Sequence, residues 1–129
     1  MKIDFTSIMV DDQDKAEQFY TEVLGFQKKV DVPVGEFRWI TLVSPVAPDG
    51  VQLVLEPNEN PVGKAFQLGI YEQGIPATAF TVDDVQQEYE RLSGLGVRFT
   101  TPTTTEDWGS MAVFDDTVGN LIQIQQIAE

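Results

Sequence analysis

FTSIMVDD at residues 5–12 and ATAFTVDD at residues 77–84 are two copies of one pattern, in which a short strand-like run ends in an Asp-Asp pair. The second copy begins 72 residues after the first, at Ala77 instead of Phe5. Aspartate is favoured at the N-cap and in the first turn of a helix, so each pair is interpreted as a helix cap and not as a pair of catalytic carboxylates. The repeat therefore predicts two modules, each of which begins with a strand followed by a helix.

The rest of the chain repeats in the same order. Helices are predicted over about residues 12–24 and 84–95, each ended by a glycine in the matching triplets Leu24-Gly25-Phe26 and Leu95-Gly96-Val97. Three strands then follow in each half, at about residues 27–32, 37–43 and 51–56, and at about 98–101, 110–114 and 121–126. Turns between them are predicted at Pro33, Pro45, Pro48, Asp49-Gly50 and Pro102.

These landmarks predict a single domain, residues 1–129, made of two fused modules. Module one covers about residues 1–56, a joining segment covers 57–74, and module two covers about 75–129. Within the joining segment, Ala65–Tyr71 is expected either as a short helix or as a cap over a cavity. The alignment of the last strands places Gln52 opposite Gln123, at an offset of 71 residues.

Composition limits the partners and the chemistry. The formal net charge of −13 argues against nucleic acid and anionic membranes, which both require a basic surface. No apolar run reaches the roughly 20 residues that cross a bilayer, and the opening Met1–Asp4 does not resemble a signal peptide, so a cytoplasmic protein is expected. Cysteine and histidine are both absent, which removes thiolate and imidazole as nucleophiles, bases and metal ligands.

The string Ile8-Met9-Val10-Asp11-Asp12, followed by Ala16, Phe19-Tyr20 and Leu24-Gly25-Phe26, resembles the opening of glyoxalase and bleomycin-resistance proteins. The closing run 115–124, DDTVGNLIQI, resembles the D-x-x-G-N turn that enters the last strand of the same group, the vicinal oxygen chelate superfamily, which also includes extradiol dioxygenases. The resemblance implies an α+β fold in which two tandem βαβββ modules form an open, curved, barrel-like sheet around a cavity. It also implies a homodimer.

Metal-dependent members of that superfamily hold their ion with residues on the first and fourth strands of each module. By the resemblance, these positions are Phe5, Gln52, Ala77 and Gln123 in this chain. Phe5 and Ala77 cannot coordinate a cation, and the two glutamines offer only neutral amides, so we expect no metal and no cofactor. One alternative stays open, since Glu56 lies on the same strand face as Gln52 and could bring a carboxylate from an offset position.

Strand alternation predicts which side chains line the cavity. Phe5, Ser7 and Met9 share one face of the first strand, while Ile8 and Val10 are expected to pack under the helix. The expected ligand pocket comprises Phe5, Ser7, Arg38, Trp39, Gln52, Val54, Ala77, Ala79, Trp108 and Gln123. The alternative is a filled interior in which Phe5 and Met9 belong to the core.

Three of these residues have competing interpretations. Trp39 is either a ligand surface or ordinary core or dimer-interface packing, and packing is slightly favoured. Trp108 lies in a predicted polar loop, residues 103–109, where a gate or an interface plug is expected. Arg38 could bind a ligand carboxylate or phosphate, but an ion pair with Glu36 or another acid is the favoured interpretation.

The first functional hypothesis is therefore a metal-free protein that binds a small organic molecule, such as an antibiotic. The alternative is a glyoxalase- or dioxygenase-like enzyme, a lyase or isomerase, that uses an unrecognised metal site or no metal. A metal-free enzyme would need Glu36, Glu56 or a tyrosine as its base.

Overall fold

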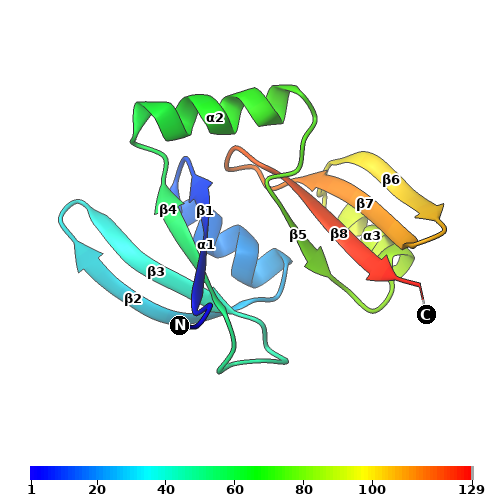
Figure 1. Ribbon diagram of the computed structural model, residues 1–129, viewed down its shortest axis with the longest axis horizontal. Coiled ribbons are helices and arrows are strands. Elements are labelled where there is room, and N and C mark those ends of the chain that lie inside the picture. The colour runs from blue at the N-terminus through cyan, green and yellow to red at the C-terminus, as the bar shows by residue number, and fades with distance from the viewer. Residues whose placement is uncertain (129) are drawn as a thin grey trace. The chain divides into compact units, whose positions relative to one another are not determined.

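The computed structural model describes residues 1–128 and divides into two compact units (Figure 1). Unit 1 is Met1–Ala65, and unit 2 begins at Phe66. Unit 1 contains β1 (Phe5–Val10), α1 (Gln13–Gln18), η1 (Phe19–Val23), β2 (Gln27–Val34), β3 (Phe37–Val43) and β4 (Gln52–Pro57). Its sheet has the order β1-β4-β3-β2, with β1 parallel to β4 and the other neighbours antiparallel.

Unit 2 repeats this arrangement with its own strands. It contains β5 (Thr78–Thr81), α3 (Val85–Gly94), β6 (Phe99–Glu106), β7 (Gly109–Asp115) and β8 (Leu121–Ile127), and the sheet order is β5-β8-β7-β6. The chain passes from unit 1 to unit 2 within helix α2 (Pro61–Glu72), which is longer than the stretch expected from the sequence. The α+β class and the two βαβββ modules are confirmed, and each sheet is open and curved (Figure 1).

The two Asp-Asp pairs are helix caps, as the repeat predicted. Asp12 accepts a hydrogen bond from the backbone N–H of Lys15, and Asp84 accepts one from Gln87, each at 3.0 Å. The first helix differs from the expectation because its second half, η1, is a π-helix. Gly25, which follows it, has a φ of +93°, a conformation that residues with a Cβ rarely adopt.

The predicted turns at Pro33 and Pro102 are wrong, because both prolines lie inside strands. Pro33 is in β2 and Pro102 is in β6, and these are the outer strands of their sheets. Proline has no N–H to donate and is tolerated at a sheet edge, where one row of backbone groups needs no partner. The register of β6 against β7 is also irregular around Pro102, between Thr101 and Thr104.

The predicted polar loop at residues 103–109 is also wrong in most of its length, because β6 continues past Pro102. Residues up to Glu106 extend β6, and only Asp107 and Trp108 make the turn into β7. Glu106 pairs directly with Gly109 across this turn.

Each unit has its own core between one sheet face and its helix. In unit 1, Ile8 and Val10 are buried on the helix side, as predicted, with Ile40, Leu42, Leu55, Ala16 and Tyr20. In unit 2, Phe80 and Val82 are only half-buried, and the core is formed mainly by Ala112, Phe114, Ile122, Ile124, Val85 and Leu92. Among residues 1–128, no helix has the length and apolar character needed to cross a membrane.

The D-x-x-G-N turn anchors α2 within unit 2. Buried Asp116 accepts hydrogen bonds from the backbone N–H groups of Val118 and Asn120 and from the Asn120 amide, at 2.9, 2.9 and 2.8 Å. Gln67 of α2 then donates to Asn120 Oδ1 at 3.1 Å. Buried polar groups need hydrogen-bond partners, and these bonds supply them. The D-x-x-G-N motif therefore has a structural role in this chain.

Candidate functional site

The face of the unit 1 sheet that points away from α1 carries a group of aromatic and apolar side chains with a few polar ones. Strand register aligns Phe5 with Gln52, Ser7 with Val54, and Val54 with Thr41. We call this the aromatic face and define it by Phe5, Ser7, Phe37, Trp39, Gln52, Val54 and Glu56. Trp39 and Phe5 are 37% and 47% exposed, and the neighbouring strand β2 adds the exposed Val32 and Val34. A contiguous exposed apolar patch of this kind is typical of a binding surface.

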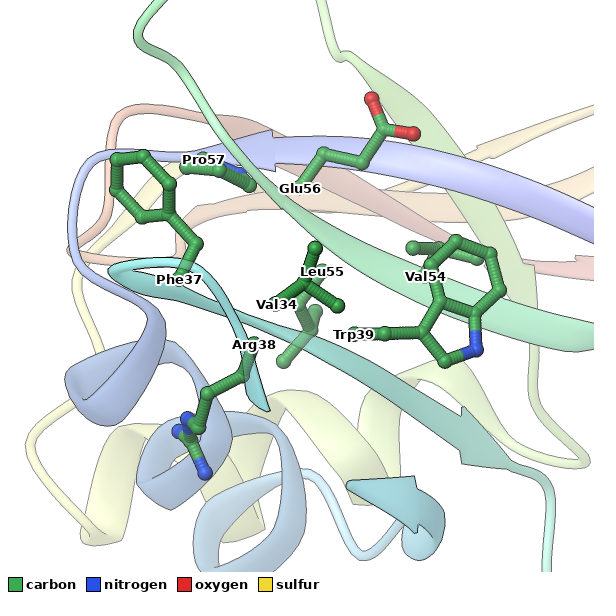
Figure 2. A pocket seen from close by; sticks show the side chains of 8 residues that line it. All are labelled: Val34, Phe37, Arg38, Trp39, Val54, Leu55, Glu56 and Pro57. Atoms are coloured by element: carbon green, nitrogen blue, oxygen red, sulfur yellow. The ribbon is translucent and has the colours of Figure 1, made fainter. Parts of the chain in front are cut away.

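A hollow of about 350 Å³ lies on the aromatic face (Figure 2). It is lined by Val34, Phe37, Arg38, Trp39, Val54, Leu55, Glu56 and Pro57, which come from β2, β3 and β4. The Phe5 ring packs edge-on against Trp39 with 5.6 Å between ring centroids. Phe5 therefore supports the indole from outside the lining.

Glu56 is the acidic group of this hollow. Figure 2 shows the Glu56 side chain extending from β4, with its carboxylate directed away from the Phe37 ring. Ser7 Oγ donates a hydrogen bond to Glu56 Oε1 at 3.0 Å, and Glu56 has no cationic partner among residues 1–128. The carboxylate is thus positioned by a neutral group that leaves its charge uncompensated.

Arg38 borders the hollow, but its guanidinium points away from it toward α1 (Figure 2). It forms ion pairs with Asp31, Glu17 and Asp14 at 2.8, 2.9 and 2.9 Å. Burial alone would lower the pKa of Arg38, but the hydrogen bond to Glu17 and the charges of Asp31 and Asp14 outweigh burial and raise that pKa. The ion-pair interpretation therefore describes Arg38, with these three acids as partners in place of Glu36.

Gln13 is a positioning residue that sequence reasoning missed. Its Nε2 donates to the carbonyl oxygens of Arg38 and Leu55 at 2.8 and 2.9 Å, and its Oε1 accepts from the Arg38 N–H at 3.1 Å. One side chain at the start of α1 thus holds β3 and β4 beside Trp39 and Glu56. Nothing in the local sequence distinguishes this glutamine from an exposed one.

Phe37, Val34 and Pro57 were also absent from the expected pocket. Alternation along β3 would have found Phe37, because it shares a face with Trp39. Of the expected residues, Phe5, Ser7, Trp39, Gln52 and Val54 come together on the aromatic face. Only Trp39 and Val54 of these line the hollow.

The four remaining expected residues belong to unit 2. Ala77 and Ala79 are exposed, and Gln123 pairs in register with Ala79 and donates to Gln125 Oε1 at 3.0 Å. Trp108 is 44% exposed in the β6–β7 turn, where its carbonyl oxygen accepts from the N–H of Ala128 at 2.8 Å.

The duplicated βαβββ order and the D-x-x-G-N turn agree with comparisons to known proteins. A family model described as Glyoxalase/Bleomycin resistance protein/Dioxygenase superfamily matches residues 2–124. The chain belongs to this superfamily.

Its relatives include proteins of similar length. The Bacillus subtilis (strain 168) protein YurT is 60% identical over 126 residues, which cover 98% of this chain and 99% of YurT. The crystal structure of UcmS2 is similar with a TM-score of 0.83 and 32% identity, covering 97% of both chains. The structure of TnmS3, an antibiotic-binding protein from Streptomyces sp. CB03234, is similar with a TM-score of 0.79 and 28% identity, covering 99% of this chain and 97% of TnmS3.

This chain has poor metal ligands at the four positions where metal-dependent superfamily members bind their ion. Phe5 and Ala77 carry hydrocarbon side chains, and Gln52 Oε1 already accepts a hydrogen bond from Thr41 Oγ1 at 2.8 Å. A divalent cation held by oxygen ligands normally needs several of them, usually with a carboxylate. Within residues 1–128, no three Asp or Glu side chains gather where they could hold an ion together. The donor set therefore does not fit the superfamily's metal.

Strand register also corrects one part of the repeat alignment. Gln52 pairs with Phe5, whereas Gln123 pairs with Ala79, the counterpart of Ser7. Since Ser7 pairs with Val54, the counterpart of Gln123 in unit 1 is Val54 and not Gln52. This correction places another hydrocarbon side chain at a superfamily ligand position.

Proposed function

We propose that this superfamily member binds a small organic molecule, without a metal, in the hollow of unit 1 beside Trp39. The observation that carries the proposal is a supported aromatic surface that remains exposed to water around a hollow of about 350 Å³. That volume is within the range of small-molecule sites, which combine apolar walls with a few polar groups. A flat ligand that covers Trp39 gains the free energy of removing both apolar surfaces from water.

The ligand class follows from the walls and from one relative. Phe37, Trp39, Val54 and Pro57 supply apolar contact, which suits a molecule with a ring system. TnmS3 is an antibiotic-binding protein, and its likeness to this chain supports an antibiotic-like ligand. The superfamily's metal chemistry has no support in the donor set, so binding is preferred to a metal-dependent reaction.

Three further features belong to the same proposal. The protein acts as a homodimer, which light scattering would check. It acts in the cytoplasm and takes no nucleic acid as a partner, and the net charge of −13 supports the last point.

The test uses Trp39 as its own reporter. Trp108→Phe leaves Trp39 as the only indole, because the chain contains two tryptophans. We expect antibiotics with fused aromatic rings to change the Trp39 emission saturably, and to do so equally after treatment with a chelator. In a second titration, followed by calorimetry, Trp39→Leu should weaken binding by about tenfold or more, as expected for a central aromatic contact. Trp108→Leu, the matched control, should bind normally.

Two results would overturn the proposal. If no compound of this class alters the Trp39 emission, or if Trp39→Leu binds as well as the parent protein, the hollow is not the binding site. If the chelator abolishes binding, the metal-free part of the proposal is wrong.

A further inference from the structure

The hollow beside Trp39 combines ring faces with one uncompensated carboxylate. Glu56 is exposed, and among residues 1–128 its carboxylate accepts a hydrogen bond only from the neutral Ser7 hydroxyl, on Oε1, so Oε2 is available to a ligand. Arg38 is the one cation that borders the hollow in the described part of the chain, and it is turned toward α1 and bound by three acids. No positive group among the residues that line the hollow therefore points into it, and an anionic ligand would find no cationic partner there.

A second, acidic hollow adjoins the first and strengthens the negative field. It has a volume of about 340 Å³ and shares Phe37, Arg38 and Pro57 with the hollow beside Trp39. Its acidic lining residues are Asp11, Asp12, Asp14, Glu36 and Glu59. Charges of one sign around a concave surface raise the local concentration of ions of the opposite sign.

We propose that the ligand of this hollow is an organic cation, with a ring system against Trp39 and Phe37 and a protonated amine at Glu56. This inference rests on the proposed function and names its ligand class. An ammonium group near an aromatic face is attracted by the ring quadrupole, and Glu56 adds a direct ion pair. An ammonium fits better than a guanidinium, whose paired N–H groups favour both oxygens of a free carboxylate, because Ser7 already occupies Oε1.

The experiment compares three probes that share one naphthalene ring and differ in charge. These are 2-naphthylmethylamine, 2-naphthylmethanol and 2-naphthoate, each titrated against the whole chain by ligand-observed NMR. We expect the amine to bind about fivefold tighter than the alcohol, and the carboxylate to bind most weakly. Raising the salt concentration should reduce the advantage of the amine, because the ion pair is exposed.

Glu56→Gln separates the local ion pair from the overall charge. It keeps the acceptor for Ser7 and should remove the preference for the amine while the alcohol binds as before. Glu22→Gln is the matched control, since both variants change the net charge from −13 to −12 and Glu22 is exposed on η1. The control should keep the fivefold preference. Circular dichroism and thermal melting would show that both variants are folded.

The outcomes distinguish this inference from the proposed function. Equal affinity for the amine and the alcohol overturns the inference and leaves ring binding in place. Loss of the preference in Glu22→Gln as well overturns the role of Glu56. Failure of all three probes to bind overturns both the inference and the proposed site.

Discussion

Arg38→Met removes the guanidinium that three carboxylates share but keeps most of the alkyl chain. The contribution of each carboxylate to the free energy of unfolding depends on how exposed its side chain is. Asp14 is 91% exposed, so its ion pair contributes little, whereas Glu17 and Asp31 are each about a quarter exposed and hold the guanidinium at 2.9 and 2.8 Å. At about 1 kcal/mol for each of these two charge-assisted hydrogen bonds, the variant should lose about 2 kcal/mol of unfolding free energy.

Urea denaturation at pH 7 measures this loss. With a typical slope of about 2 kcal/mol per molar urea, the midpoint should fall by about 1 M. Arg91→Met is the matched control, because Arg91 pairs with Glu88 within one exposed helix turn and should contribute only about 0.3 to 0.5 kcal/mol.

The loss of unfolding free energy caused by Arg38→Met should become smaller at acidic pH. The hydrogen bond from Lys28 and the charge of Arg38 hold the pKa of Asp31 below its ordinary value of 3.8. A carboxylate whose pKa is lowered by folding stabilises the protein above the unfolded pKa, and this contribution disappears as the pH falls through the folded pKa. An Arg38→Met variant with normal stability that instead fails to bind its ligand would refute this account and make Arg38 a ligand contact.

Two further predictions concern unit 2. Gly109→Ala should destabilise the protein by about 3 kcal/mol or more in a thermal melt, because a Cβ at its φ of +148° would overlap the carbonyl oxygen of Gln126. Gly94→Ala, in open space at the end of α3, should instead gain about 0.5 kcal/mol, and equal effects of the two changes would contradict this reasoning. Burial would raise the pKa of Asp115, but hydrogen bonds from Tyr71, the Thr117 N–H and Arg98 outweigh burial and lower that pKa. Asp115→Asn should therefore cost about 1 to 2 kcal/mol at pH 7 and progressively less as the pH falls below 3.8, and a cost independent of pH in urea titrations would argue against it.

Local signals predicted the modules well because they act over a few residues. The Asp12 and Asp84 caps, the glycines after the first helices and the alternation that buries Ile8 and Val10 depend only on near neighbours in the chain. The prolines were misread for the opposite reason. Whether a proline ends a strand or lies within it depends on whether that strand is at the sheet edge, which is decided by distant residues.

The candidate site was predicted only in part. Of the residues expected in the pocket, Arg38, Trp39 and Val54 line the hollow, and alternation along β3 and β4 would have added Phe37 and Glu56. The direction of Arg38 could not be predicted, because its three carboxylate partners come from α1 and β2 and meet it only in the folded unit.

The sequence by itself determined the duplicated βαβββ order, the helix caps, the superfamily and the absence of cysteine and histidine from any site. Only the tertiary structure decided the register of the parallel strand pairs, which makes Val54 and not Gln52 the counterpart of Gln123. It alone turned Arg38 away from the hollow and placed Glu56 in its lining, hydrogen-bonded to Ser7. The physical reason is that strand pairing and ion pairing join groups far apart in the chain, whereas periodicity and capping are properties of the local backbone.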